Sequence, residues 1–511
     1  MNRNKVLLLV LLLASFSLAA CSGPKTVCTV NCGGGGNATV SFTLVADTLP
    51  ANPSILSFKI TVVGIALTPT TGTAQTLQPS SPIVDLMRLQ SDTAFLGALT
   101  NVPSGSYTVQ VTLSSPEITF LNDTGAPITA NGVPCPDTFV CTATLTAVGT
   151  PTISSFTFNA TASGQQGIEI DFNLKNAISL SGGTLSVNFN PSSPNPGVFT
   201  AFTLPRTNAN LGTNQLELIE DFTGVVSISG STVTITSPTR GVLSATVTSS
   251  SFFDQSPVPT NLCPSAPNNC AAAGQIASVD AFLKSDGTLE LKEFEPLNST
   301  QQDFVEGTVF SIDSNSSTQF SIAVTDKVQL ATNSLIGGLN TGDLLTVNIP
   351  VATIQPFIVD TKGLAVQAGS LGLFQGKADT SAIHPGQTVS VHVTAFTAAT
   401  STTIAIATAD TVTLRWSRLF AIPTGTSTST VVNVNSVPAY FNITSASVFP
   451  TQVFSGTLGA DGVTNLDGIS GTAANVNANP PVPPVGLRVL YLENSSNSAQ
   501  FPFMAAKIRQ H

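Results

Sequence analysis

Residues able to carry acid–base or metal chemistry are scarce in this sequence, which has three histidines among 511 residues. His384 precedes a Pro-Gly turn, His392 lies on the polar side of an alternating pattern, and His511 is the last residue shown. We expect the first two to be solvated. Asp379 and Asp410 lie near them in sequence and are the carboxylates that would orient a catalytic base or complete a metal site.

Motifs of common catalytic sites do not occur. The sequence contains no nucleophile elbow, zinc-protease motif, P-loop or dinucleotide fingerprint. Asp461, Asn465 and Asp467 suggest a calcium loop, but their spacing departs from the EF-hand pattern and its final Glu is missing, so we expect a solvated turn. We therefore predict no catalytic residues, no metal and no cofactor.

Six of the seven cysteines form three couples that are local in sequence. In an oxidising compartment such spacing favours local disulfides, although six cysteines allow 15 connectivities. Cys28 and Cys32 form either a small disulfide or free thiols, since a zinc site would need further ligands. For the other two couples we expect loop disulfides: Cys135 with Cys141, and Cys263 with Cys270.

The N-terminus has the layout of a secretory signal. A short basic segment is followed by the apolar run 6–18, which is too short for a permanent membrane span, so residues 1–20 are predicted to be a signal peptide. Leu18-Ala-Ala-Cys21 resembles the lipobox of bacterial lipoproteins. The resemblance implies cleavage before Cys21 and acyl chains that fix the protein to a membrane. The alternative is an ordinary cleaved signal with Cys21 as a plain thiol.

The residues after Cys21 extend the same resemblance. Ser22 in place of Asp implies sorting to the outer membrane, on its periplasmic or its surface face. Residues 21–37 contain four consecutive glycines and no apolar periodicity, which predicts a flexible tether.

Short alternating runs separated by Gly, Pro, Ser, Thr and Asn indicate an all-β protein. Tyr107 to Leu113 places apolar residues on one face, and Ile168 to Leu174 does the same with carboxylates outward. Both patterns predict half-buried antiparallel strands. Residues 38–200 contain enough such runs for one antiparallel β-sandwich.

Within this region, Pro82-Ile-Val-Asp-Leu86 and Pro103-Ser-Gly105-Ser-Tyr107 resemble a β-sandwich domain found at the N-terminus of many bacterial envelope lipoproteins. The Pro-x-Gly-x-Tyr turn is also similar to that of transthyretin-like modules. The family has no assigned activity to carry over. We expect Gly105 to permit the turn and Tyr107 to begin the buried face of the next strand.

The remainder of the chain repeats. Phe222-Thr-Gly224 and Phe304-Val-Glu-Gly307 open two similar units, and Leu414 to Ile422 stands where a third begins. The order of short strands resembles the OB-fold and tandem barrel domains of bacterial secreted proteins. We therefore predict three small, independent OB-like barrels, arranged as a string of beads: 217–298, 302–415 and 416–511.

The composition of the chain excludes some classes of function. Hydrophobic residues make up 42% of the chain and charged residues 9%, with a net charge of −10, which opposes nucleic-acid binding. Trp416 continues an inward register and is expected in the core.

We favour a non-enzymatic, lipid-anchored envelope protein with a structural or interaction role, whose partner is an envelope protein or a glycan. The alternatives are a small-ligand or glycan-binding lipoprotein and a metal-assisted hydrolase.

Overall fold

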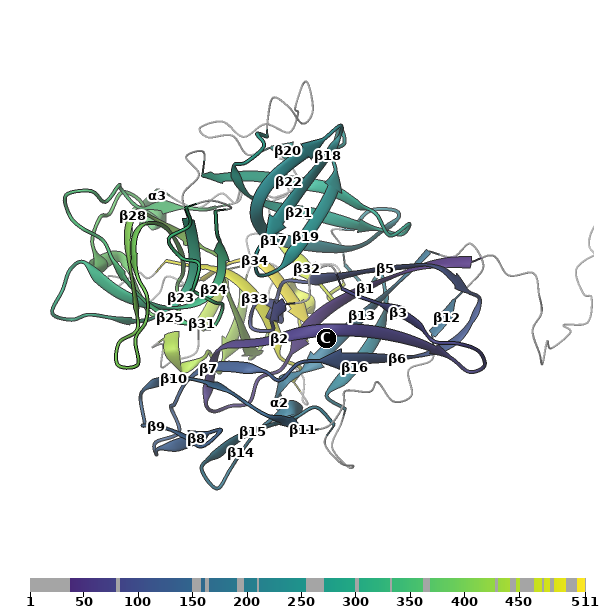
Figure 1. Ribbon diagram of the computed structural model, residues 1–511, viewed down its shortest axis with the longest axis horizontal. Helices are drawn as coiled ribbons and strands as arrows, with labels where there is room; N and C mark the ends of the chain where they lie inside the picture. The colour runs from purple at the N-terminus through teal and green to yellow at the C-terminus, as the bar shows by residue number, and fades with distance from the viewer. Residues whose placement is uncertain are drawn as a thin grey trace, which may run out of the picture.

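The protein is built almost entirely from β-strands, as the sequence predicts (Figure 1). No helix among the described residues is long and apolar enough to cross a membrane. The computed structural model describes residues 37–79, 83–148, 158–160, 165–190, 197–208, 211–253, 271–298, 303–330, 333–361, 368–427, 431–441, 447–450, 464–470, 473–477, 482–492 and 503–510.

The first module is a β-sandwich with a small third sheet. The first sheet has the order β16 (Phe199–Leu204), β13 (Gln165–Asn173), β1 (Asn37–Asp47), β5 (Ala94–Pro103). The second has the order β10 (Val140–Thr144), β7 (Glu117–Leu121), β2 (Ser54–Pro69), β6 (Gly105–Leu113), β12 (Phe158–Ala160), with β3 (Gln75–Leu77) and β4 (Ile83–Asp85) also paired to β2. The third sheet contains β11 (Ala147–Val148), β15 (Thr184–Asn188), β8 (Ile128–Ala130), β9 (Val133–Cys135) and β14 (Ile178–Ser181). Two short helices, η1 (Arg88–Gln90) and α2 (Leu174–Ala177), complete the module.

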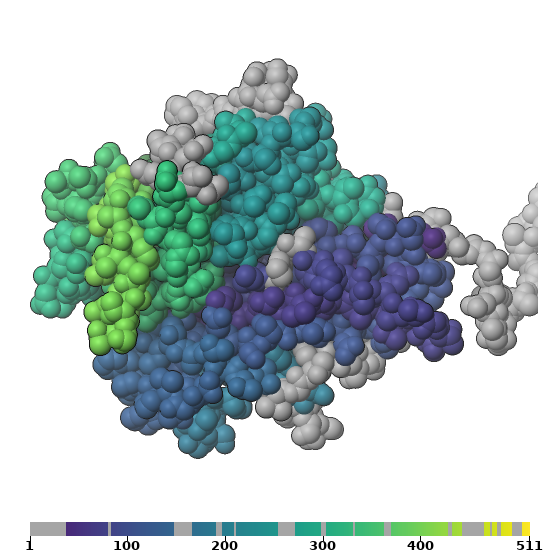
Figure 2. Space-filling view, viewed as in Figure 1, coloured from purple at the N-terminus to yellow at the C-terminus, as the bar shows by residue number. Residues whose placement is uncertain are grey.

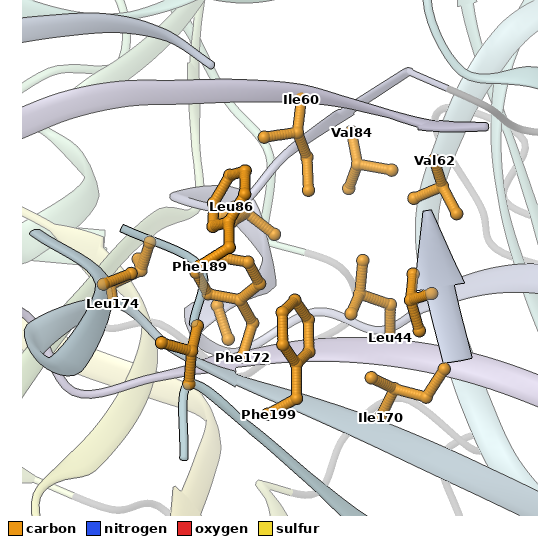
Figure 3. Close-up of a cluster of buried hydrophobic side chains, with 14 of the residues drawn as sticks. Leu44, Ile60, Val62, Val84, Leu86, Ile170, Phe172, Leu174, Phe189 and Phe199 are labelled. Carbon is orange, nitrogen blue, oxygen red and sulfur yellow. The ribbon is translucent and has the colours of Figure 1, made fainter. Parts of the chain in front are cut away.

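The sandwich core forms where the inner faces of its two large sheets meet. Leu44 and Phe172 come from the first sheet, and Ile60 and Val62 from the second (Figure 3). Phe172 makes an edge-on contact with Phe199, with ring centroids 4.5 Å apart. Burial of these side chains removes apolar surface from water, which is the main force holding the two sheets together.

Two features of the first sheet differ from the sequence-based expectation. β1 and β13 pair in parallel, from Thr39 opposite Gln165 to Asp47 opposite Asn173, because the long intervening chain allows a crossover. The carboxylates predicted to face outward, Glu169 and Asp171, are buried instead. Other modules cover the outer face of this sheet, and burial raises the pKa of Asp171 well above its usual range.

The motif around Tyr107 has a clear structural role. Tyr107 is buried at the start of β6, as expected, and its hydroxyl donates a hydrogen bond to the carbonyl oxygen of Pro103 at 2.6 Å. This bond ties the end of β5 to the start of β6. Gly105, by contrast, has no positive φ, so the turn does not depend on glycine's conformational freedom there.

Three six-stranded sheets follow the sandwich. Barrel 1 consists of β17 (Gln215–Ser229), β18 (Thr232–Ser237), β19 (Gly241–Thr246), β20 (Phe252–Phe253), β21 (Ile276–Lys284) and β22 (Leu289–Asn298). Barrel 2 consists of β23 (Asp303–Ile312), β24 (Gln319–Val328), β25 (Leu344–Asn348), β26 (Ile358–Val359), β27 (Thr388–Thr397) and β28 (Ala405–Arg415), with α3 (Ala368–Leu371) and η2 (Thr380–Ala382) between strands. Barrel 3 consists of β29 (Ser417–Pro423), β30 (Val431–Asn435), β31 (Ser447–Pro450), β32 (Asn465–Asp467), β33 (Val485–Tyr491) and β34 (Phe503–Gln510), with η3 (Ala439–Phe441) and η4 (Ala473–Asn475).

All three sheets share one strand order. In barrel 1 it is β19-β18-β17-β21-β22-β20, and barrels 2 and 3 repeat it. Parallel pairing closes the first two sheets, between β19 and β22 and between β25 and β28. This order with a parallel closing pair is the arrangement of an OB-like barrel, in agreement with the predicted fold class.

The modules are packed together rather than strung out as beads. Figure 2 shows the sandwich, in purple to blue, in contact with barrel 1 in teal and barrel 2 in green. The Asp286-Gly287 hairpin turn of barrel 1 has Gly287 at φ +83°, and a side chain there would meet Thr39 of the sandwich. In barrel 2, Gly342 accepts a hydrogen bond from Thr119 of the sandwich at 2.5 Å. In barrel 3, a side chain at Gly486 would collide with the carbonyl of Gln90 in η1.

Candidate functional site

The most unusual site in the protein is a group of buried charges where all four modules meet. Most of its side chains are less than about a tenth exposed. We call it the central charge cluster, and it consists of Arg88 and Asp92 from the sandwich, Glu220, Asp221 and Arg240 from barrel 1, Glu306, Asp326 and Arg415 from barrel 2, and Arg418, Asp467, Arg488, Lys507 and Arg509 from barrel 3.

Strand alternation places these charges on the outsides of the barrels. In β29 and β33, Leu419 and Leu487 point into the core of barrel 3 while Arg418 and Arg488 lie on the opposite face. The outer faces of the barrels meet one another, so the charges are buried although they lie outside each barrel core. Of the arginines after residue 20, only Arg206 lies outside this cluster.

Arg418 joins three other modules. Its Nε lies 2.7 Å from Asp92 Oδ2 of the sandwich, and its Nη2 lies 2.6 Å from Asp221 Oδ2 of barrel 1. Its Nη1 lies 3.4 Å from Glu306 Oε1 of barrel 2. The five donors of one planar guanidinium make such branching possible, whereas an ammonium group would act as a single point of charge.

The strand β34 supplies a second branch. Lys507 Nζ lies 2.7 Å from Glu220 Oε2, and Arg509 Nε lies 2.6 Å from Asp467 Oδ2. Arg509 also donates to the backbone carbonyl of Asp92 at 2.9 Å. Arg488 donates to both Glu220 and Asp221, so barrel 3 is bonded to barrel 1 through two strands.

The third branch connects barrel 2 with the sandwich and with barrel 1. Arg88 Nη1 lies 2.7 Å from Glu306 Oε1. Arg415 Nη1 lies 2.8 Å from Asp360 Oδ2 and 3.0 Å from Glu295 Oε1, both buried carboxylates next to the cluster. Of these three pairs, those with Glu306 and Glu295 cross a module boundary, so this branch helps to specify how the modules are oriented.

The electrostatics show which protonation states the cluster favours. Burial alone would raise the pKa of Asp92, but Arg418, Arg488 and Arg88 outweigh it and hold that pKa below its usual value. The pKa of Glu306 is lowered in the same way. At the edge of the cluster, burial and the nearby Asp467 raise the pKa of Glu217 to about 8. Asp92 and Glu306 are therefore ionised at neutral pH, whereas the neighbouring Glu217 is mostly protonated there.

This arrangement is suited to holding modules together. Its cations and carboxylates neutralise one another, and neither described histidine belongs to it. Removal of one partner from such a pair leaves an uncompensated buried charge and is strongly destabilising, whereas the intact pairs mainly specify geometry.

The residues selected from the sequence for acid–base chemistry lie elsewhere. His392 is partly buried rather than solvated, and its Nδ1 lies 3.8 Å from Asp410 Oδ1. Burial lowers its pKa below the usual value despite this carboxylate. His384 is partly buried beside Tyr491, with ring centroids 6.3 Å apart, and Asp379 is an exposed cap of η2. His511 lies outside the described residues.

The expected solvated turn around Asp467 is wrong. Asn465 and Asp467 form β32 and are buried, because Asp467 pairs with Arg509 and Lys507 in the central charge cluster. Asp461 lies outside the described residues. Across the part of the chain that the structure describes, no three His, Cys, Asp or Glu side chains are placed to hold a metal ion.

Among the cysteines, Cys135 and Cys141 form the predicted disulfide. Cys21, Cys28, Cys32, Cys263 and Cys270 lie outside the described residues, so the lipidation site and the other two pairings stay predictions. Trp416 is fully buried, in agreement with its expected place in the core, and the guanidinium carbon of Arg488 lies 5.8 Å from the centre of its ring.

The central charge cluster was not predicted from the sequence. Its signal is present in the strands that carry charges at every second position among apolar residues, such as Lys507 and Arg509 in β34. A charge on the polar side of a strand normally indicates solvent, so the pattern alone does not separate a solvated face from one covered by another module.

Comparisons with known proteins add little. No protein-family model matches the chain, and a search of curated proteins also finds no match. A search of solved structures finds Drosophila Unr CSD456, with 8% sequence identity and a TM-score of 0.11, covering 57% of this chain and 97% of that chain. Similarity at this score carries no argument about fold or function.

Proposed function

We propose that this protein is a lipid-anchored, non-enzymatic component of a bacterial cell envelope, which holds a sandwich and three OB-like barrels as one block on a flexible tether. The anchor rests on the resemblance of Leu18 to Cys21 to a lipobox. The observation that carries the structural role is the central charge cluster, because it uses nearly all of the chain's arginines to connect modules. By the same resemblance, the block is tethered to the outer membrane.

The chain's aromatic residues do not favour glycan binding. Carbohydrate sites commonly stack sugar rings on exposed Trp or Tyr side chains. Here Trp416, Tyr107, Tyr440 and Tyr491, which are all of the Trp and Tyr in the chain, are buried. An envelope protein is therefore the partner that we favour over a glycan.

The anchor is tested with Cys21→Ser expressed in a bacterium with an outer membrane. We expect loss of metabolic labelling by radioactive palmitate and release of the protein from the membrane fraction. The double variant Cys135→Ser and Cys141→Ser serves as the control and should stay labelled and membrane-bound. Unchanged membrane retention of Cys21→Ser would contradict the proposal.

A further inference from the structure

A cleft of about 460 Å³ lies between the sandwich and barrel 3. Its volume is in the range of small-ligand sites, and such sites are often found between domains. Three prolines give it rigid apolar walls: Pro50 from the sandwich, and Pro438 and Pro484 from barrel 3. Leu49, Val437 and Val482 add partly exposed apolar surface.

One carboxylate is fixed at this cleft without a cationic partner. Asp123 accepts hydrogen bonds from the backbone N–H of Ser54 at 3.2 Å and from its hydroxyl at 2.7 Å. The Ser54 hydroxyl oxygen also accepts from the N–H of Ala439 in barrel 3 at 3.2 Å. Each oxygen of Asp123 keeps a further acceptor position, and none of the described cations pairs with it.

One cation lines the same cleft without an anionic partner. Lys175 lies on α2 with an exposed side chain, while its backbone N–H donates to the carbonyl of Thr48 at 2.9 Å. No carboxylate among the described residues lies within ion-pair distance of it. The cleft therefore presents one negative and one positive group on apolar walls.

The backbone at the cleft is held in uncommon conformations. Thr48 has φ 37° and Ser436 has φ 58°, and both residues line the cleft from opposite modules. A positive φ is unfavourable for residues other than glycine, especially a β-branched one, and such strain is concentrated at ligand sites in proteins. This observation is independent of the two charges.

We propose that the cleft binds a short apolar peptide with free termini, whose ammonium group meets Asp123 and whose carboxylate meets Lys175. Among the described residues that line the cleft, Lys175 is the one cation, and a nucleotide would require more. A sugar would require exposed aromatic rings, and Phe420, the one aromatic residue in the described lining, is buried. The inference does not depend on the lipid anchor.

The test uses calorimetric titration of the full chain carrying Cys21→Ser. The dipeptide Leu-Leu is expected to bind, N-acetyl-Leu-Leu to bind more weakly because it lacks the ammonium group, and Leu-Leu amide to bind more weakly because it lacks the carboxylate. Dihexanoyl phosphatidylcholine carries the same pair of charges on a lipid. Binding of this lipid in place of Leu-Leu, or no binding of Leu-Leu, overturns the peptide assignment.

Variants locate the site. Asp123→Asn and Lys175→Met should each weaken Leu-Leu binding by about tenfold or more, as expected for loss of one charged hydrogen bond. The matched controls are Asp313→Asn and Lys377→Met, which change exposed charges on barrel 2. Thermal melting of each variant shows whether it is folded. Equal weakening by variant and control, or unchanged affinity in both cleft variants, places the peptide elsewhere and contradicts the proposal.

Discussion

A single arginine side chain can connect several modules of this protein. Arg418 contacts Asp92, Asp221 and Glu306, and each of these carboxylates comes from a different module. Burial of ions costs solvation free energy that pairing only partly offsets, so the intact cluster contributes modest net stability. Loss of one member, however, leaves its partners charged and without compensation. The cluster is therefore far more sensitive to substitution than partly exposed ion pairs such as Lys284 with Glu290.

Arg418→Met is expected to destabilise the protein by about 3–5 kcal/mol, because Asp92 and Asp221 lose a close cation in a buried site. Chemical denaturation at pH 7 measures the change. Lys377→Met, which removes an exposed charge, should change stability by less than about 0.5 kcal/mol. The prediction fails if the two variants are equally stable.

Glu217 makes stability depend on pH at the edge of the cluster. It lies near Asp467, Lys507, Glu169 and Arg509, and its pKa in the folded protein is about 8 against a usual 4.5. A raised pKa means that the folded state binds the proton more tightly than the unfolded state does. Protonation of Glu217 therefore adds its full contribution to the free energy of unfolding below pH 4.5, and this contribution is lost as the pH rises through 8. Glu217→Gln should therefore be more stable than the natural protein at pH 8.5, with the difference shrinking towards pH 4.5. Urea denaturation at both pH values tests this, and a difference that grows at low pH would contradict it.

At the scale of the element, strands and turns could be predicted while the surfaces between modules could not. The alternation from Tyr107 to Leu113 is a local signal, and it appears in the structure as predicted. Whether Glu169 faces water depends on a barrel whose sequence begins much later, and no local pattern records that contact. The same reason explains why the central charge cluster was missed and why Asp467 was placed in a solvated turn.

The contact between β33 and η1 can be tested with one methyl group. Gly486→Ala would place a Cβ against the carbonyl of Gln90, so the two elements must move apart. We expect a loss of about 1–3 kcal/mol of stability. Gly338→Ala is the control, since no heavy atom lies within 4 Å of its added Cβ. If Gly486→Ala is as stable as Gly338→Ala, barrel 3 does not pack against the sandwich as described.

At the scale of the whole molecule, the four modules should behave as one cooperative unit. Each barrel has a core of its own, but the buried pairs between modules make separate unfolding costly. Buried pairs are also screened much less by salt than exposed ones.

Calorimetry of the full chain is therefore expected to show a single unfolding transition at both 0.05 and 1 M NaCl, salt concentrations on either side of roughly physiological ionic strength. Arg418→Met should split or broaden this transition, because it weakens three module contacts at once. Separate transitions in the natural protein, or a split that appears only at high salt, would favour independent beads.

The position of β34 in the chain has a consequence for biosynthesis. A ribosome makes this strand after every other element described above, yet its Lys507 and Arg509 complete the contacts of Glu220 in barrel 1 and of Asp92 in the sandwich. During synthesis the earlier modules can form their own cores, but the junction between them waits for the final strand. A chain that is cut short near residue 500 would lack β34, which also supplies Phe503 and Ile508 to the core of barrel 3. The charged faces around Glu220 and Asp92 would then stay open to water, and proteases and chaperones could recognise the shortened chain by them.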